Sequence, residues 1–160
     1  AASELGFSLA PELGVPMVTL RLFHVFGIGE SEYRLIPSLI KGLDAGLPVD
    51  LTAGGQVRDF IYVDDAANAF AAAWDAAELE PYQVFNVCSG SPVTVRAVAE
   101  KVADAMEKPH DLLNFGALPK REDEEPWIVG DNAKFTGAAG WRPGVTLDEG
   151  IRRMVADCGS

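Results

Sequence analysis

Blocks of apolar residues separated by polar turns predict strands and helices in alternation along the chain. Residues 17–26, MVTLRLFHVF, are rich in β-branched and aromatic side chains and almost continuously apolar, which is typical of a buried parallel strand. Residues 82–87, YQVFNV, have the same character. Residues 49–63 predict two short strands on either side of a Gly-Gly turn, the second over residues 57–63.

Helical spacing of the apolar residues marks most of the remaining chain. Asp64 precedes an alanine-rich segment and Asp131 a shorter one, so both occupy positions typical of N-cap residues. We expect helices over residues 1–14, 35–46, 64–78, 94–107, 132–140 and 147–157. Residues 111–116 predict one more strand, whereas residues 89–94 and the charged residues 117–126 predict loops. Strands that alternate with helices indicate an α/β fold.

Length and charge narrow the classes of function. The 160 residues suffice for about one domain, and 13 Lys and Arg against 24 Asp and Glu give a formal charge of −11. This charge disfavours a nucleic-acid or anionic-membrane surface, although a few arginines could still hold a small anion. No apolar run approaches the ~20 residues that cross a bilayer, and residues 1–16 lack the basic start of a secretory signal. Cys88 and Cys158 permit one disulfide, but we expect free thiols in a cytoplasmic protein.

Several common catalytic and phosphate-binding motifs are absent from the sequence. The nearest string to GxGxxG is residues 27–32, GIGESE, in which Glu32 replaces the third glycine and would repel a pyrophosphate. Neither GxxxxGK[ST] nor GxSxG occurs. His24 and His110 have no metal-binding spacing, so we expect no metal site. None of the three tyrosines is followed by Lys four residues later.

Five segments, in order and in spacing, resemble the C-terminal half of the extended short-chain dehydrogenase/reductase family. They are RLFHVFGIGESEYRLIPSLI, GGQVRDFIYVDDAANAF, VFNVCSGSPVTVRAVAE, PKREDEEPWIVGDNAKF and GWRPGVTLDEGI. The family comprises NAD(P)-dependent nucleotide-sugar epimerases, dehydratases and 4-keto reductases, and the resemblance covers nearly the whole chain. The sequence around RLIPSLI and LTAGGQVRDF is most similar to reductases and epimerases that act on deoxyhexoses.

The resemblance implies an α/β fold with a nucleotide-sugar-binding lobe and the last strands and helices of a Rossmann-like parallel sheet. The N-terminal Rossmann half, which in the family carries the glycine-rich loop and the catalytic Tyr-x-x-x-Lys, is absent from this sequence. Within a single unit, we expect residues 1–34 and 64–107 to form the sheet remnant, and residues 35–63 and 108–160 the lobe. Sheet edges exposed without that half would favour a homo-oligomer.

The resemblance also implies which residues bind a ligand. Arg58 in QVRDF and Arg121 in PKRED match two arginines that bind the diphosphate of the nucleotide sugar, and a guanidinium suits phosphate oxygens. His24 replaces a family Asn that hydrogen-bonds the sugar diphosphate, and imidazole also donates or accepts hydrogen bonds. Leu35 matches a residue beside the base, and Thr52 stands where many relatives stack an aromatic side chain on the base.

Leu22 and Phe23 match backbone that lines the nicotinamide when the Rossmann half is present. Purely structural roles remain as alternatives for the site residues. In those alternatives Leu22 and Phe23 are core, His24 packs at a strand end, Arg58 pairs with Asp59 or Asp64, and Arg121 balances its acidic neighbours.

Two functions are compatible with the sequence. The first is the C-terminal, substrate-binding portion of an NAD(P)-dependent nucleotide-sugar epimerase, dehydratase or reductase, inactive alone, with a nucleoside-diphosphate sugar as its partner. Its cofactor in the family is NAD or NADP, and we expect neither to bind this chain tightly without the glycine-rich loop. The second is a non-catalytic module that binds nucleotide sugars or self-assembles. An upstream reading frame that encodes the loop and Tyr-x-x-x-Lys would support the first.

Overall fold

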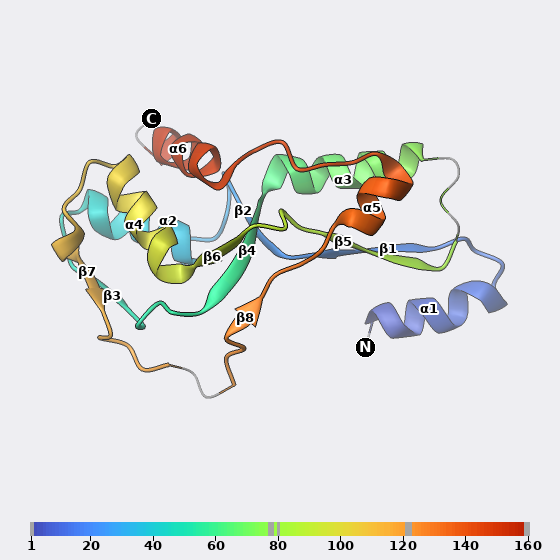
Figure 1. The fold of residues 1–160 in the computed structure, drawn as a ribbon, viewed down its shortest axis with the longest axis horizontal. Helices are drawn as coiled ribbons and strands as arrows, with labels where there is room; N and C mark the ends of the chain where they lie inside the picture. The colour runs from blue at the N-terminus through green and yellow to red at the C-terminus, as the bar shows by residue number, and fades with distance from the viewer. Residues whose placement is uncertain (1, 77–78, 80, 121–122, 159–160) are drawn as a thin grey trace.

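Strands and helices alternate in the computed structural model, which confirms the predicted α/β class. The structure describes residues 2–76, 79, 81–120 and 123–158. The helices are α1 (Ala2–Glu12), α2 (Leu35–Asp44), α3 (Val63–Asp75), α4 (Val95–Ala105), α5 (Ala133–Ala139) and α6 (Leu147–Cys158), with a 3-10 turn at His110–Leu112. The strands are β1 (Val18–Leu22), β2 (His24–Phe26), β3 (Val49–Leu51), β4 (Val57–Tyr62), β5 (Gln83–Val87), β6 (Pro92–Thr94), β7 (Leu113–Phe115) and β8 (Trp127–Ile128). Figure 1 shows them spread along an elongated molecule.

The apolar segment predicted as one strand over residues 17–26 divides at Phe23. On one side β1 pairs in parallel with β5, and on the other β2 pairs in parallel with β4. The backbone N–H of Phe23 still donates to the carbonyl of Val87 at 3.1 Å, so the chain leaves the first ladder only at this residue. The predicted extent of the strand is therefore confirmed, while the change of partner has no signal in the sequence.

Strand β4 is the centre of the sheet that also contains β2, β6 and β8. It pairs in parallel with β2 and β8 and antiparallel with β6, whereas β3 pairs in parallel with β7 in a separate sheet. The two strands predicted around the Gly-Gly turn exist as β3 and β4, but they lie in different sheets. The loop predicted over residues 89–94 is wrong for its last three residues, because a strand as short as β6 shows no apolar period.

The turn between β3 and β4 is held against the start of α4. The carbonyl of Gly54 accepts a hydrogen bond from the backbone N–H of Arg96 at 2.9 Å. Gly54 has φ +73°, and a Cβ at this position would lie 2.9 Å from the Arg96 nitrogen. Both the left-handed backbone and the close approach therefore require glycine here.

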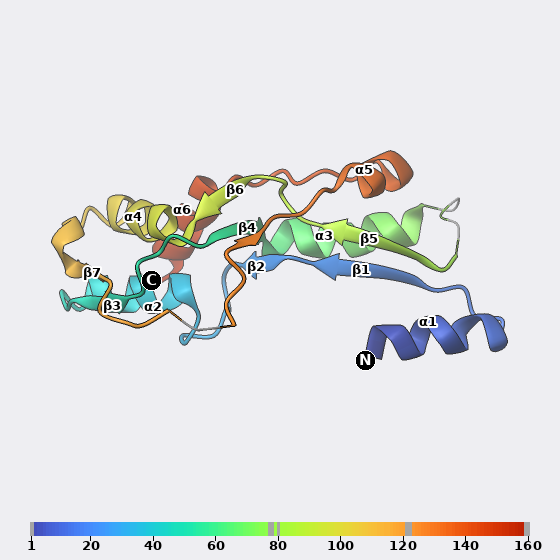
Figure 2. The same ribbon diagram turned by 60° about the horizontal axis from the view of Figure 1, so that its bottom comes forward.

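Two apolar clusters stabilise the two ends of the molecule. The first buries one face each of α2, α4 and α6 and includes Leu39, Leu43, Val98, Val102 and Ile151. The second packs α3 and α5 against β5 and includes Ile61, Ala69, Phe85, Val87, Phe135 and Trp141. Helix α1 lies across β1 and β5 from α3 in both views (Figures 1 and 2).

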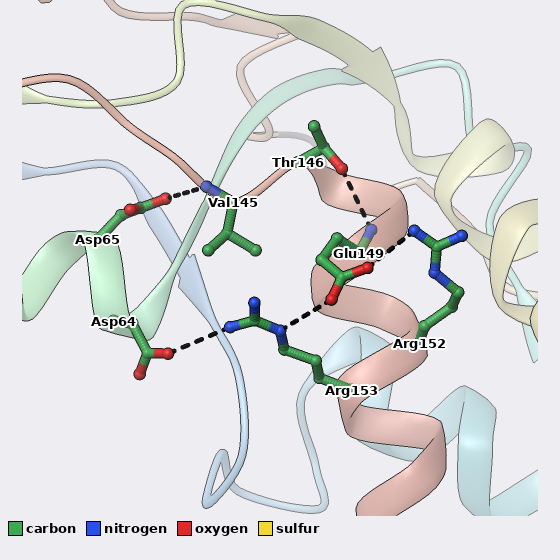
Figure 3. A network of polar contacts seen from close by, with 7 residues as sticks. All are labelled: Asp64, Asp65, Val145, Thr146, Glu149, Arg152 and Arg153. Atoms are coloured by element: carbon green, nitrogen blue, oxygen red, sulfur yellow. Dashed lines mark hydrogen bonds and ion pairs between the residues drawn. The ribbon is translucent and has the colours of Figure 1, made fainter.

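Polar contacts join the start of α3 to α6 and the segment before it (Figure 3). The buried carboxylate of Asp65 accepts a hydrogen bond from the backbone N–H of Val145 at 2.8 Å. The guanidinium of Arg153 on α6 lies 3.4 Å from the carboxylate of Asp64. The prediction that Asp64 is an N-cap is wrong, because Tyr62 occupies that position and Asp64 lies in the first turn.

Side chains satisfy the first N–H groups of α4 and α5. The hydroxyl of Thr94 caps α4 and accepts the N–H of Ala97 at 3.1 Å. The carboxylate of Asp131 accepts the N–H of Ala133 at 2.8 Å, although Asn132 occupies the N-cap position of α5. The prediction that Asp131 is the N-cap is therefore wrong by one position, although its carboxylate still accepts the N–H of the first residue of α5.

Both cysteines are free thiols, as predicted. Cys88 is buried and Cys158 is exposed. None of the helices within the described ranges has the length and apolar content to span a bilayer. Among the same residues, no three His, Cys, Asp or Glu side chains gather as metal ligands.

Candidate functional site

A cavity of about 470 Å³ lies between α2, β3, β4 and the segment that precedes β8. Its wall includes His24 on β2, Leu35 at the start of α2, Thr52 after β3 and Arg58 on β4. The parallel pairing of β2 with β4 and the close approach of the Gly54 turn to α4 bring these elements together. Four residues that the sequence predicts for ligand binding thus line one space.

Arg58 is the most buried charged group of this wall, with 7% of its side chain exposed. Its Nη2 lies 3.0 Å from Oε1 of Glu124, and its Nη1 donates to the carbonyl of Val57 at 2.9 Å. The alternative that pairs Arg58 with Asp59 or Asp64 is wrong, because the partner comes from a segment 66 positions away. The other predicted arginine, Arg121, lies outside the described residues.

The carboxylate of Asp59 points away from Arg58 and holds three backbone segments together. Successive side chains of a strand point to opposite faces, which separates these two neighbours. Asp59 is fully buried and accepts hydrogen bonds from the N–H and hydroxyl of Ser89, at 2.8 and 2.7 Å, and from the N–H groups of Gly90 and Gly130, at 2.9 and 3.2 Å. These contacts fix β4 behind the cavity wall.

His24 contributes a neutral polar ring to the cavity. Its ring packs against Phe60 with a centroid distance of 5.7 Å. Burial lowers the pKa of His24, and the positive charges of Arg58 and Arg34 lower it further, while Asp59 acts in the opposite direction. The imidazole is therefore uncharged at neutral pH and acts as one donor and one acceptor. Its Nδ1 is buried and has no hydrogen-bond partner in the part of the chain that the structure describes.

An ion pair between Glu30 and Arg34 adds one charge of each sign to the same wall. The Nε of Arg34 lies 3.2 Å from Oε1 of Glu30, whose side chain is 15% exposed. Burial raises the pKa of Glu30, and the hydrogen bond and charge of Arg34 oppose that rise. Its second oxygen, Oε2, is buried without a partner among the described residues. The wall therefore presents unused hydrogen-bonding groups beside two arginines.

Thr52 and Leu35 shape the far side of the cavity. The Thr52 hydroxyl accepts hydrogen bonds from the N–H of Gly54 and from Nε2 of Gln56, both at 3.3 Å. Thr52 therefore stabilises the turn before β4 while it lines the cavity. Leu35 is the first residue of α2 and places an apolar side chain at the same wall.

Leu22 and Phe23 line an adjoining cavity of about 310 Å³, together with His24 and Arg34. Leu22 is 40% exposed, so the alternative that treats it as a core residue is wrong. Phe23 is half-buried and lies against Gly130, where a Cβ would come within 2.7 Å of its ring. The two predicted cofactor-binding residues thus sit at the end of β1, one residue from the larger cavity.

The sequence analysis did not assign several other residues to the larger cavity, among them Glu30, Arg34, Gln56 and Glu124. Arg34 precedes Leu35 directly and Gln56 lies two positions before Arg58, so proximity to predicted site residues was an available signal. Glu124 lies in the charged segment predicted only as a loop, and nothing local distinguishes it from its acidic neighbours.

Comparisons with known proteins identify the family of the chain. The sequence profile of the NAD dependent epimerase/dehydratase family matches residues 1–88. The CDP-abequose synthase of Salmonella typhimurium is 31% identical over 95% of this chain and 52% of its own length. The dTDP-4-dehydro-6-deoxyglucose reductase of Escherichia coli is 26% identical over 92% of this chain and 46% of its own length.

Among solved structures, the UDP-glucose 4-epimerase of Thermus thermophilus in complex with NAD superposes with a TM-score of 0.84. It is 30% identical, and the match covers 96% of this chain and 50% of the epimerase. The chain thus spans about half the length of the curated relatives and of this structure. The matched half agrees with the predicted C-terminal portion.

Proposed function

We propose, because the chain belongs to the NAD dependent epimerase/dehydratase family, that it forms the C-terminal, substrate-binding portion of an NAD(P)-dependent nucleotide-sugar epimerase, dehydratase or reductase. The observation that carries the proposal is that His24, Leu35, Thr52 and Arg58, from four separate segments of the chain, line one cavity. A volume of about 470 Å³ lies within the range of small-molecule sites. The ligand class is a nucleoside-diphosphate sugar.

In this proposal the predicted site residues bind two regions of the ligand, its sugar diphosphate and its base. Arg58 and Arg121 bind the diphosphate, where charge-assisted hydrogen bonds are strongest. The neutral ring of His24 contacts the sugar diphosphate, and Leu35 and Thr52 lie beside the base. The names of two relatives, a CDP-abequose synthase and a dTDP-4-dehydro-6-deoxyglucose reductase, favour a nucleotide-bound sugar as the substrate, and the second name favours a deoxyhexose.

The proposed division assigns the segments of the chain to two parts. Residues 1–34 and 64–107 approximately continue the Rossmann-like sheet, and residues 35–63 and 108–160 form the substrate lobe. The parallel pair β1 and β5, covered by α3, supports the first part. Helix α4 packs against α2 and α6, so it connects the sheet remnant to the lobe. The β1–β5 pair leaves an edge at which a second copy of the chain or the other half of the family's fold would pair.

Leu22 and Phe23 fit the edge of a nicotinamide site because Leu22 is exposed beside His24 at the end of β1. NAD or NADP, when bound, would supply hydride chemistry. The role of this chain would be to hold the sugar next to the nicotinamide site through His24. Because its sequence lacks the glycine-rich loop and Tyr-x-x-x-Lys, we propose that the chain alone neither binds the cofactor tightly nor transfers hydride.

Two free thiols support the cytoplasm as its compartment.

Titration calorimetry of the 160-residue chain with CDP, UDP, dTDP and GDP tests the proposal. We expect at least one diphosphate to bind, and Arg58→Gln to weaken that binding about tenfold to a hundredfold, as for one lost charge-assisted bond. Arg152→Gln is the matched control, because Arg152 is exposed on α6 and lies outside the cavity. Equal affinities of the two variants would contradict the assignment of Arg58.

A further inference from the structure

We propose that Glu124 is a positioning residue, which holds the guanidinium of Arg58 in the orientation that receives the diphosphate. This inference rests on the proposed function. Glu124 is joined to Arg58 by a hydrogen-bonded ion pair of 3.0 Å, and the two side chains are 21% and 7% exposed. Exposed ion pairs contribute little to stability, but a buried arginine that loses its partner retains an uncompensated charge. The effect of the ion pair is therefore to compensate the charge of Arg58 and to hold its guanidinium in place.

Two restraints fix the Arg58 fork. Nη2 is bound by Glu124 and Nη1 by the carbonyl of Val57, so two of the five N–H groups have partners within the described protein. A planar guanidinium held at both terminal nitrogens cannot rotate, and its remaining N–H groups keep fixed directions. An arginine fixed before the ligand arrives loses less conformational entropy on binding.

The backbone around Glu124 is anchored to the strand that carries Arg58. The N–H of Val57 donates to the carbonyl of Pro126 at 2.8 Å, and β8 pairs with β4 so that Ile128 lies opposite Arg58. Glu124 lies two residues before Pro126. Its carboxylate and the guanidinium of Arg58 are therefore positioned by the same backbone ladder.

Glu124 exerts two opposite effects on an incoming diphosphate. Its negative charge repels the ligand, whereas its hydrogen bond orients the arginine that attracts the ligand. Because the two groups are paired, the charges of Glu124 and Arg58 compensate each other, so the net field of the pair on the cavity is small and binding depends on the directions of the remaining guanidinium N–H groups. The orienting effect should then dominate, and removal of the charge should weaken binding. Simple repulsion would give the opposite sign.

The test compares Glu124→Gln with Glu125→Gln in calorimetric titrations of the full 160-residue chain. Both variants remove one negative charge from the same segment, but Glu125 is exposed and does not line the cavity. With CDP, UDP, dTDP or GDP, whichever binds the wild type most tightly, Glu124→Gln should weaken binding about tenfold and Glu125→Gln less than twofold. The corresponding nucleoside monophosphate should show a smaller loss, because it lacks part of the diphosphate that Arg58 binds. A general structural defect would instead weaken the binding of both ligands alike.

A double variant distinguishes a role of Glu124 in positioning Arg58 from a general structural defect caused by the substitution. If Glu124 acts through Arg58, Glu124→Gln added to Arg58→Gln should cause no further loss of affinity. Tighter diphosphate binding by Glu124→Gln, or losses that multiply in the double variant, would overturn the proposal.

A second measurement does not depend on the ligand. In ¹⁵N spectra of the ligand-free chain, the Nη–H signals of Arg58 should be resolved in the wild type and Glu125→Gln, and should merge through rapid rotation in Glu124→Gln. Unchanged signals in Glu124→Gln would also overturn the proposal. If no diphosphate binds the wild-type chain, the proposed function fails, and these signals alone decide whether Glu124 holds Arg58.

Discussion

Replacing Asp59 by Asn should destabilise the chain strongly, although the two side chains have nearly the same shape. The Asp59 carboxylate is fully buried, and each of its oxygens accepts two hydrogen bonds. Oδ1 is bound by the N–H and hydroxyl of Ser89, and Oδ2 by the N–H groups of Gly90 and Gly130. An amide can provide an oxygen on one side only, so its NH₂ group must face donors on the other.

The introduced amide can take two orientations, and the better of the two sets the decrease in the free energy of unfolding. With its NH₂ turned toward Ser89, the hydroxyl can accept a hydrogen bond, but the backbone N–H of Ser89 loses its partner. A buried unpaired N–H costs about 1–3 kcal/mol, and the bonds that remain lose about 1 kcal/mol each when their acceptor is no longer charged. Relief from burying a charge offsets part of this loss. We expect a decrease of about 2–4 kcal/mol in the free energy of unfolding, against a typical total of about 5–15 kcal/mol.

Urea denaturation at pH 7, followed by far-UV circular dichroism, measures this decrease. Asp64→Asn is the matched control, because the Asp64 side chain is 61% exposed and its contact with Arg153 is 3.4 Å. We expect that control to change the free energy of unfolding by less than about 0.5 kcal/mol. Equal stability of the Asp59→Asn and Asp64→Asn variants would refute the role given to the four hydrogen bonds of Asp59.

Two further predictions concern titration and reactivity. Hydrogen bonds from Arg153 and Arg152 lower the pKa of Glu149, so its stabilising contribution is present at neutral pH and is lost as the pH falls below about 4.5. Glu149→Gln should therefore flatten the acid limb of a plot of melting temperature against pH, and an unchanged limb would contradict this. Burial raises the pKa of the Cys88 thiol to about 12, with the charge of Asp59 acting in the same direction. Intact-mass measurements with iodoacetamide at pH 8 should show modification of exposed Cys158 long before Cys88, and equal rates would contradict the buried site.

The helices could be predicted from the sequence because their apolar spacing is local. The same local reasoning identified the extended residues 17–26 and 82–87, but it could not assign the partners of β2 and β4, which depend on the whole fold. Strands β6 and β8 span three and two residues, too few for any period.

The sequence motifs predicted which residues line the cavity, but they did not predict which charged groups pair there. His24, Leu35, Thr52 and Arg58 meet in one cavity, yet the partner of Arg58 lies 66 positions away. Pairing with Asp59 or Asp64 was the structural alternative for Arg58, because these charges are close to it in sequence. Strand geometry instead sends the side chains of Arg58 and Asp59 to opposite faces. No property of residue 124 taken alone shows that its carboxylate reaches β4.

The division of one extended segment at Phe23 has a consequence for how this protein can change. Leu22 borders the smaller cavity and His24 the larger, and two residues of extended backbone separate their Cα atoms by about 6.6 Å. The distance between two chemically different ligand environments is thus set by covalent geometry, which side-chain substitutions do not alter. Deletion or insertion of a single residue here would turn His24 to the opposite face and shift every contact beyond it. Natural variation at this junction should therefore exchange side chains while its length stays constant.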